Sequence, residues 1–163
     1  MTHGKVRYKD YSPTANDSNA TSLPLYTIGI AAKLTNTSVH TLRMYEDKGL
    51  ILPHKTRTNR RVYSQTDIEQ ILCIRKHIVE DGLNIAGIKA ILAMVPCWEF
   101  RPCSQECRES CDAYTSISEP CWSASSKGKE CQNIDCRTCD VYLLANKCSD
   151  IKALYKELMN KKD

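Results

Sequence analysis

The chain has 163 residues, 42% of them hydrophobic, and a formal net charge of +4. This length allows one or two small domains, and the sequence contains no run of 18 apolar residues that could span a membrane. Because the polar N-terminus lacks the apolar region of a secretion signal, we expect a cytoplasmic protein without a membrane partner. Ten cysteines in a reducing compartment favour metal binding or redox chemistry over a disulfide framework.

Residues 1–23 contain almost no aliphatic side chains and predict a flexible N-terminal arm. Residues 25–34 then predict a short helix with Thr27 as N-cap. Its expected inward face consists of Ile28, Ala31, Ala32 and Leu34. A tight turn at residues 35–37 leads into a second helix, so the pattern predicts a helix-turn-helix whose second helix is placed for the major groove of DNA.

The second helix is marked at both ends. Thr37 or Ser38 is suited to be its N-cap, and Gly49 stands where a left-handed residue ends a helix. Apolar residues repeat at helical spacing between them and predict one buried stripe. The opposite face carries side chains that donate to phosphates or base edges, namely Ser38, His40, Thr41 and Arg43.

Residues 51–63 predict a β-wing with a turn at Thr58–Asn59. The cations of the wing are Lys55, Arg57, Arg60 and Arg61. Residues 23–63 hold seven basic and two acidic side chains, so this block carries +5, more than the whole chain. This charge beside a short helix favours nucleic-acid binding over a solvated loop.

Two further helices follow the wing. A capping box at Ser64–Asp67 opens a helix that is expected to run to about Asp81, where Gly82 ends it. Asn84 caps the next helix, and Pro96 stops it. Cys73 lies among apolar residues of the longer helix, so we expect a small core residue and not a metal ligand.

The stretch that runs from YTIGIAAKL through LRMYEDKGL and RRVYS to EDGLNIAGIKAIL resembles the winged-helix domain of the MerR family of bacterial transcription regulators, and especially its heat-shock-repressor (HspR-like) branch. The resemblance covers about residues 26–94. It implies a mainly α-helical, winged helix-turn-helix DNA-binding domain, which we place at residues 24–96. It also implies a homodimer that binds inverted-repeat operators in double-stranded DNA at promoters, with RNA polymerase as a further partner.

The resemblance places Arg43, Tyr45 and Arg61 at DNA-contacting or groove-shaping positions of the family. With the residues chosen from local chemistry, the predicted DNA-binding set is Ser38, His40, Thr41, Arg43, Tyr45, Lys55, Arg57, Arg60, Arg61 and Tyr63. The chain departs from the family twice. Met44 stands where many members have a phosphate-contacting tyrosine, and a cysteine-rich segment replaces the long helix through which many members dimerise.

Residues 97–148 contain nine of the ten cysteines, in two similar halves. Each half opens with Cys-Trp, contains four cysteines and closes with Cys-Asp-x-Tyr, and in this it resembles a bacterial two-CW cysteine-rich module. A repeated unit of four thiols predicts two four-ligand sites, and the sequence leaves open whether ligands are shared between them. The predicted metal ligands are Cys97, Cys103, Cys107, Cys111, Cys121, Cys131, Cys136 and Cys139, with Cys148 left over.

Four thiolates are the soft ligand set that selects tetrahedral zinc or an iron–sulfur cluster, and the spacing leaves both open, with disulfides as a third alternative. About fifty residues with few aliphatic side chains cannot bury a sufficient core, so the metal would also supply folding energy. Residues 149–163 predict a C-terminal helix that packs on the module or on a second subunit.

Together these features predict a DNA-binding transcriptional regulator of the MerR type, controlled by redox state or metal through its cysteine module. The alternative is an iron–sulfur electron-transfer or assembly protein that uses the winged helix as a docking module. We do not expect an enzyme, because the sequence has no phosphate loop, nucleophile elbow or carboxylate pair, and its four histidines are scattered.

Overall fold

The computed structural model describes residues 23–101, 103–145 and Lys156. The predicted N-terminal arm and the predicted C-terminal helix at residues 149–163 therefore lie outside the described residues, apart from Leu23 and Lys156. Of the helices in the described ranges, none combines the length and the apolar character that crossing a membrane requires.

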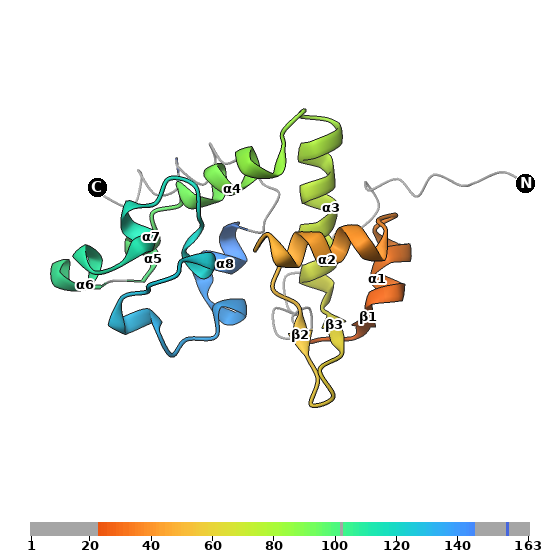
Figure 1. Ribbon diagram of the computed structural model, residues 1–163, viewed down its shortest axis with the longest axis horizontal. Coiled ribbons are helices and arrows are strands. Elements are labelled where there is room, and N and C mark those ends of the chain that lie inside the picture. The colour runs from red at the N-terminus through yellow and green to blue at the C-terminus, as the bar shows by residue number, and fades with distance from the viewer. Residues whose placement is uncertain (1–22, 102, 146–155, 157–163) are drawn as a thin grey trace, which may run out of the picture.

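The first part of the chain forms a winged helix-turn-helix, as the sequence predicts. Its elements are β1 (Tyr26–Thr27), α1 (Ile28–Leu34), α2 (Val39–Asp47), β2 (His54–Lys55), β3 (Arg61–Tyr63), α3 (Gln65–Val79) and α4 (Ile85–Ala93). The three strands form an antiparallel sheet in the order β1-β3-β2. Figure 1 shows α3 upright in the middle of the molecule, with α2 across it and the loop of the β2–β3 hairpin extending away from the other elements.

The helix boundaries follow the capping residues. The Ser38 side chain accepts a hydrogen bond from the Thr41 backbone N–H at 3.0 Å, so Ser38 and not Thr37 is the N-cap of α2. Gly49 follows α2 with a φ of +69°, which a glycine adopts without strain. Ser64 and Asp67 form the predicted capping box of α3, and Asn84 caps α4.

The beginning of α1 corrects the sequence prediction in two places. Tyr26 and Thr27 form strand β1, so the helix begins at Ile28 and not at residue 25. Leu34, the last residue of α1, is 51% exposed and does not face the core. Ala31 is the fully buried residue of this helix.

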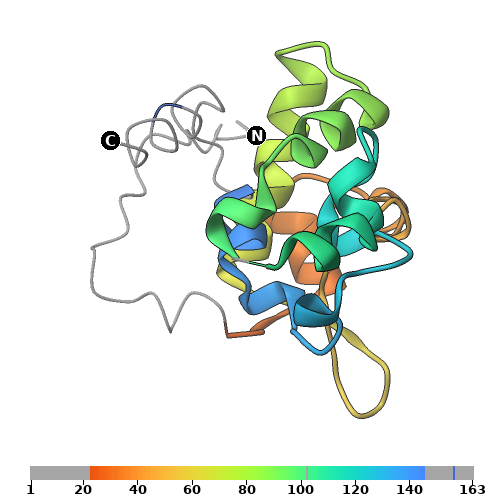
Figure 2. The same ribbon diagram turned by 90° about the vertical axis from the view of Figure 1, so that its left-hand side faces the viewer.

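Residues 97–145 form a compact cysteine module made of short helical turns. Its elements are α5 (Cys97–Phe100), α6 (Gln105–Glu109), α7 (Asp112–Thr115), the 3-10 turns η2 (Cys121–Ser123), η3 (Lys129–Cys131) and η4 (Cys136–Thr138), and α8 (Asp140–Ala145). Both ribbon views place the module beside α2 and α3, with the wing loop free of it (Figures 1 and 2). Leu92 packs against the cores of both parts, so the two cores are joined.

We predict that Ser64→Ala lowers the free energy of unfolding by about 1–2 kcal/mol, because α3 loses its N-cap. The Ser64 hydroxyl accepts from the Asp67 backbone N–H at 3.1 Å and donates to the Asp67 carboxylate at 2.8 Å. Urea unfolding followed by circular dichroism measures the change. Ser118→Ala is the control, because Ser118 is exposed. Equal stabilities of the two variants would contradict the capping role.

Candidate functional site

The outward face of α2 presents the side chains predicted to contact DNA. His40 and Arg43 are exposed, and Thr41 is half-buried. The Ser38 hydroxyl is occupied by the cap and by a 2.8 Å hydrogen bond with the Thr41 hydroxyl. Arg43 is therefore the cation that α2 itself offers to an approaching anion.

The wing tip is an ordered turn. The Thr56 backbone N–H donates to the Arg60 carbonyl at 2.9 Å, and the Thr56 hydroxyl accepts from the Arg60 N–H at 3.0 Å. Asn59 adopts the left-handed conformation with a φ of 58°, as the predicted turn requires. This turn leaves Arg57 and Arg60 exposed, and neither forms an ion pair with the residues that the structure describes.

Glu46 near the end of α2 holds the base of the wing. Its carboxylate is hydrogen-bonded to the Arg61 guanidinium and lies 3.6 Å from the Lys55 ammonium. The hydrogen bond with Glu46 raises the pKa of Arg61. Arg61 and Lys55 are therefore engaged in fixing the wing on α2, although both side chains stay partly exposed.

Two tyrosines of the predicted DNA-binding set are core residues, which corrects that prediction. Tyr45 is 3% exposed and Tyr63 is fully buried. Burial raises the pKa of Tyr63 to about 12 and also raises that of Tyr45. Both rings belong to the hydrophobic core of the winged helix and present almost no surface to a ligand.

The two halves of the cysteine module repeat one aromatic contact. The tryptophan of Cys-Trp and the tyrosine of Cys-Asp-x-Tyr pack edge to face in both halves, with ring centroids 5.0 Å apart for Trp98 and Tyr114 and 5.1 Å apart for Trp122 and Tyr142. The environments differ, because Tyr114 is 39% exposed whereas Trp122 and Tyr142 are buried. The second repeat therefore faces the DNA-binding domain, and the first repeat lies further from it.

Trp122 docks the module on the end of α2. Its indole N–H donates to the Gly49 carbonyl at 2.8 Å, and the Ser123 hydroxyl donates to the same oxygen at 3.4 Å. A Cβ at Gly49 would lie 2.2 Å from the Ser123 oxygen. The sequence predicts Gly49 because a helix ends there. The close approach of Ser123 is a second reason for a residue without a side chain at this position.

Tyr142 completes the docking contact. Its hydroxyl accepts from the Leu52 backbone N–H at 2.8 Å and donates to the Gln70 side-chain oxygen at 3.0 Å. The Gln70 amide nitrogen in turn donates to the Leu50 carbonyl. The sequence analysis missed this role of Gln70, although a glutamine among the apolar residues of a buried helix face calls for a polar partner.

All eight predicted ligands line one cavity between the two repeats. The cavity contains about 650 Å³ of space, part of it open to solvent, and three cations share its wall, Arg101, Arg108 and Lys127. In the described part of the chain no three cysteine, histidine or carboxylate ligands converge on one point. Two separate preformed four-cysteine sites are therefore absent from these residues, and ligation itself stays a prediction. Cys73 is buried on α3 and lies outside this cavity.

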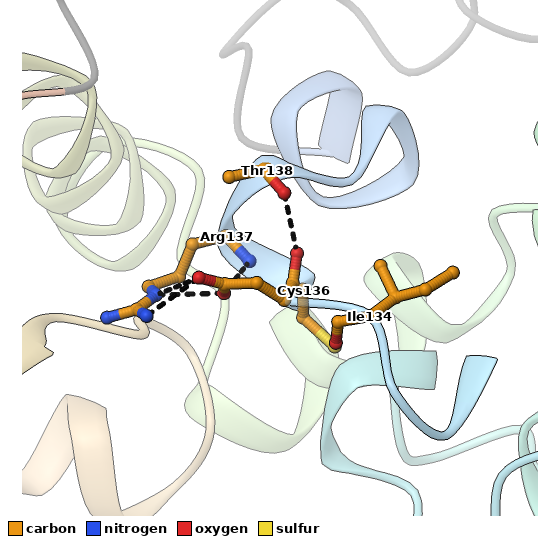
Figure 3. Close-up of polar contacts among 5 residues, drawn as sticks. Ile134, Cys136, Arg137 and Thr138 are labelled. Carbon is orange, nitrogen blue, oxygen red and sulfur yellow. Dashed lines mark hydrogen bonds and ion pairs between the residues drawn. The ribbon is translucent and has the colours of Figure 1, made fainter.

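Several of these thiols are fixed in position by hydrogen bonds or close contacts with neighbouring groups. Cys97 and Cys121, the first cysteines of the two repeats, are hydrogen-bonded to each other, which lowers the pKa of Cys97 to about 7 and raises that of Cys121. The Lys127 ammonium lies 3.3 Å from the Cys136 sulfur. Figure 3 shows that the turn around Cys136 is held by the neighbouring backbone, with the sulfur near the Ile134 carbonyl and the Thr138 hydroxyl bonded to a main-chain oxygen.

Comparisons with known proteins agree with this architecture. Residues 26–95 match the model of the MerR HTH family of regulatory proteins. The chain is 44% identical over 73 residues to the HTH-type transcriptional regulator GlnR of Bacillus anthracis. The matched stretch covers 45% of this chain and 56% of that protein. It is 38% identical over 71 residues to the putative heat shock protein HspR of Streptomyces coelicolor, which is 44% of this chain and 47% of that protein.

A third relative, the HTH-type transcriptional regulator TnrA of Bacillus subtilis, is 35% identical over 75 residues, 46% of this chain and 67% of that protein. The chain belongs to the MerR HTH family of regulatory proteins. It spans about half the length of GlnR and HspR, and the family match ends at residue 95, before the first cysteine of the module. The predicted family is thus confirmed, with GlnR similarity beside the predicted HspR similarity.

We predict that Tyr142→Phe lowers the free energy of unfolding by about 1–3 kcal/mol, because the change removes a hydroxyl partner from the partly buried Leu52 N–H and from the buried Gln70 side chain. Tyr114→Phe is the matched control, because Tyr114 holds the same position in the first repeat and is partly exposed. Urea unfolding of both variants tests the prediction, and a loss of equal size in both would refute the docking role.

Proposed function

We propose that the protein is a transcriptional regulator that binds inverted-repeat operators in promoter DNA as a homodimer and acts there on RNA polymerase. The observation that carries the proposal is the exposed basic surface formed by Arg43 on α2 and by Arg57 and Arg60 at the wing tip. A short helix flanked by a basic hairpin suits the major groove and the adjoining phosphates. The names of GlnR and TnrA, which call both proteins transcriptional regulators, support the same reading.

We further propose that the cysteine module holds zinc or an iron–sulfur centre through its eight thiols. The donor set fits, because thiolates are the ligands that both choices prefer. Bound metal would join the short helical turns, which have only a small core of their own. A change in the metal or in its redox state would then reach DNA through the docked residues Trp122 and Tyr142.

The alternative function, an electron-transfer or assembly protein that docks through its winged helix, differs in one observable. A docking module does not need cations arranged for phosphates, whereas an operator-binding protein releases counterions and loses affinity steeply as salt rises. A duplex selected from a random library provides the probe for this comparison. The absence of any selected sequence would favour the alternative.

We predict that Arg43→Ala weakens binding to the selected duplex by about 1–3 kcal/mol. Arg57→Ala and Arg60→Ala should each lower the slope of log affinity against log salt concentration by about 1, the value for one lost phosphate contact. Fluorescence anisotropy at several salt concentrations measures both effects. Lys129→Ala removes an exposed cation from the module and serves as control. Unchanged affinity of all three arginine variants would refute the proposed DNA surface.

We predict that removal of the metal changes the operator affinity by about 5–150-fold, and that Trp122→Phe reduces this change. The substitution keeps an aromatic ring and removes the indole N–H that bonds to Gly49. Trp98→Phe is the matched control from the first repeat. Anisotropy titrations before and after chelation or air exposure give the operator affinity of each variant in both states. An equal response of Trp122→Phe and Trp98→Phe would show that the signal does not pass through this contact.

A further inference from the structure

The thiols of the two repeats are interleaved around the cavity and are not separated into two groups. The thiols of Cys97 in the first repeat and Cys121 in the second, both free, are hydrogen-bonded to each other. Cys131 of the second repeat lies close enough to Cys97 and Cys111 of the first to interact with them electrostatically, and it also interacts with Cys139. A ligand that bonds to the sulfurs of one repeat therefore meets sulfurs of the other.

Close packing and hydrogen bonds between the two repeats hold them in this arrangement. Gly128 of the second repeat approaches Cys107 of the first so closely that a Cβ would lie 2.2 Å from its sulfur and 3.1 Å from its carbonyl oxygen. The Ser104 N–H and hydroxyl both donate to the Glu130 carboxylate at 3.4 Å. The Ser126 N–H of the second repeat donates to the Asp112 carboxylate of the first at 2.9 Å.

Three cationic side chains line the cavity, and one of them has a nitrogen without a hydrogen-bond partner among the described residues. The Lys127 ammonium approaches the Cys136 sulfur at 3.3 Å. The Nε of Arg108 is buried and has no hydrogen-bond partner among the described residues. Eight thiolates around a few divalent ions, or around sulfide-bridged iron, retain a net negative charge. Arg101, Arg108 and Lys127 supply cations that offset part of this charge.

The spacing of the thiols argues against ions bound one at a time. A single zinc ion needs four sulfurs about 2.3 Å from one point, and no three ligands converge in this way in the described residues. All eight cysteines nevertheless line the same cavity. A group of several metal atoms places its ligands further apart than one ion does, so it suits this wider arrangement.

We propose that the two repeats jointly bind one polynuclear centre of thiophilic metal ions, with ligands from both repeats and with sulfide or thiolate bridges between the metals. The proposal rests on the metal-binding part of the proposed function and specifies its site. Each thiol that bonds to the centre releases its proton, so loading acidifies the solution. The centre forms as a unit, because neither repeat alone provides its ligand shell.

The test is substoichiometric loading of the unmodified full chain without oxygen, followed by native mass spectrometry. One arm uses ferrous iron with sulfide and the other uses zinc alone, so the two arms identify the metal chemistry. We expect only metal-free and fully loaded chains in one of the arms. Accumulation of a half-loaded chain in both arms, or no metal uptake in either, would overturn the proposal.

A pair of variants tests the interleaving. Gly128→Ala should reduce the metal content of the whole centre by more than half, because the added methyl group displaces Cys107. Gly29→Ala is the control, because a Cβ at that position meets nothing within 4 Å. Full metal content in Gly128→Ala would contradict the shared site. Operator binding is measured on the same samples, so a failure of the shared centre is distinguished from a failure of DNA binding.

Discussion

The turn from Gly49 to Leu52 is the constraint on which the rest of the structure depends. It ends α2, starts the chain toward the wing and offers its backbone groups to the cysteine module. Gly49 meets two demands there, a positive φ and a close approach to Ser123. A side chain at this position would strain the end of α2 and would force the Ser123 hydroxyl away from it, so one residue serves both the DNA-binding helix and its contact with the module.

A buried polar network makes this contact specific. Gln70 of α3 donates to the Leu50 carbonyl and accepts from the Tyr142 hydroxyl, which itself accepts from the Leu52 N–H. The Leu52 N–H, the Gln70 side-chain oxygen and the Tyr142 hydroxyl would be unsatisfied if α8 moved away without water replacing it, and such losses are costly in a buried site. The network therefore stabilises the docked position of α8 against the turn after α2.

The sequence predicts most of the winged helix and little of how it joins the module. The helix ends at Ser38, Gly49, Ser64 and Asn84 follow from local capping chemistry, which a short stretch of sequence contains. The burial of Tyr45 and Tyr63 does not follow from local sequence, because a tyrosine with a polar tip suits both a core and a DNA surface, and only tertiary packing decides between them.

The repeat pattern likewise shows four thiols in each half and the recurring tryptophan and tyrosine, but it cannot show that the halves interleave. Spacing along the chain fixes neighbours within a repeat, whereas the approach of Gly128 to Cys107 joins residues 21 positions apart. Long-range contacts also decide which aromatic pair is buried, because Trp122 and Tyr142 bond to Gly49 and Leu52 of the winged helix.

The asymmetry of the module indicates how events at the sulfurs would reach α2. Four thiols, those of Cys97, Cys121, Cys136 and Cys139, pack against the cluster that contains Trp122 and Tyr142. Movement of these sulfurs as they draw together around a metal centre would shift both rings, because the cluster is small and closely packed. The same rings bond to the backbone at Gly49 and Leu52. A single layer of side chains thus separates these thiols from the end of α2, and it is the layer that a centre shared by both repeats would move.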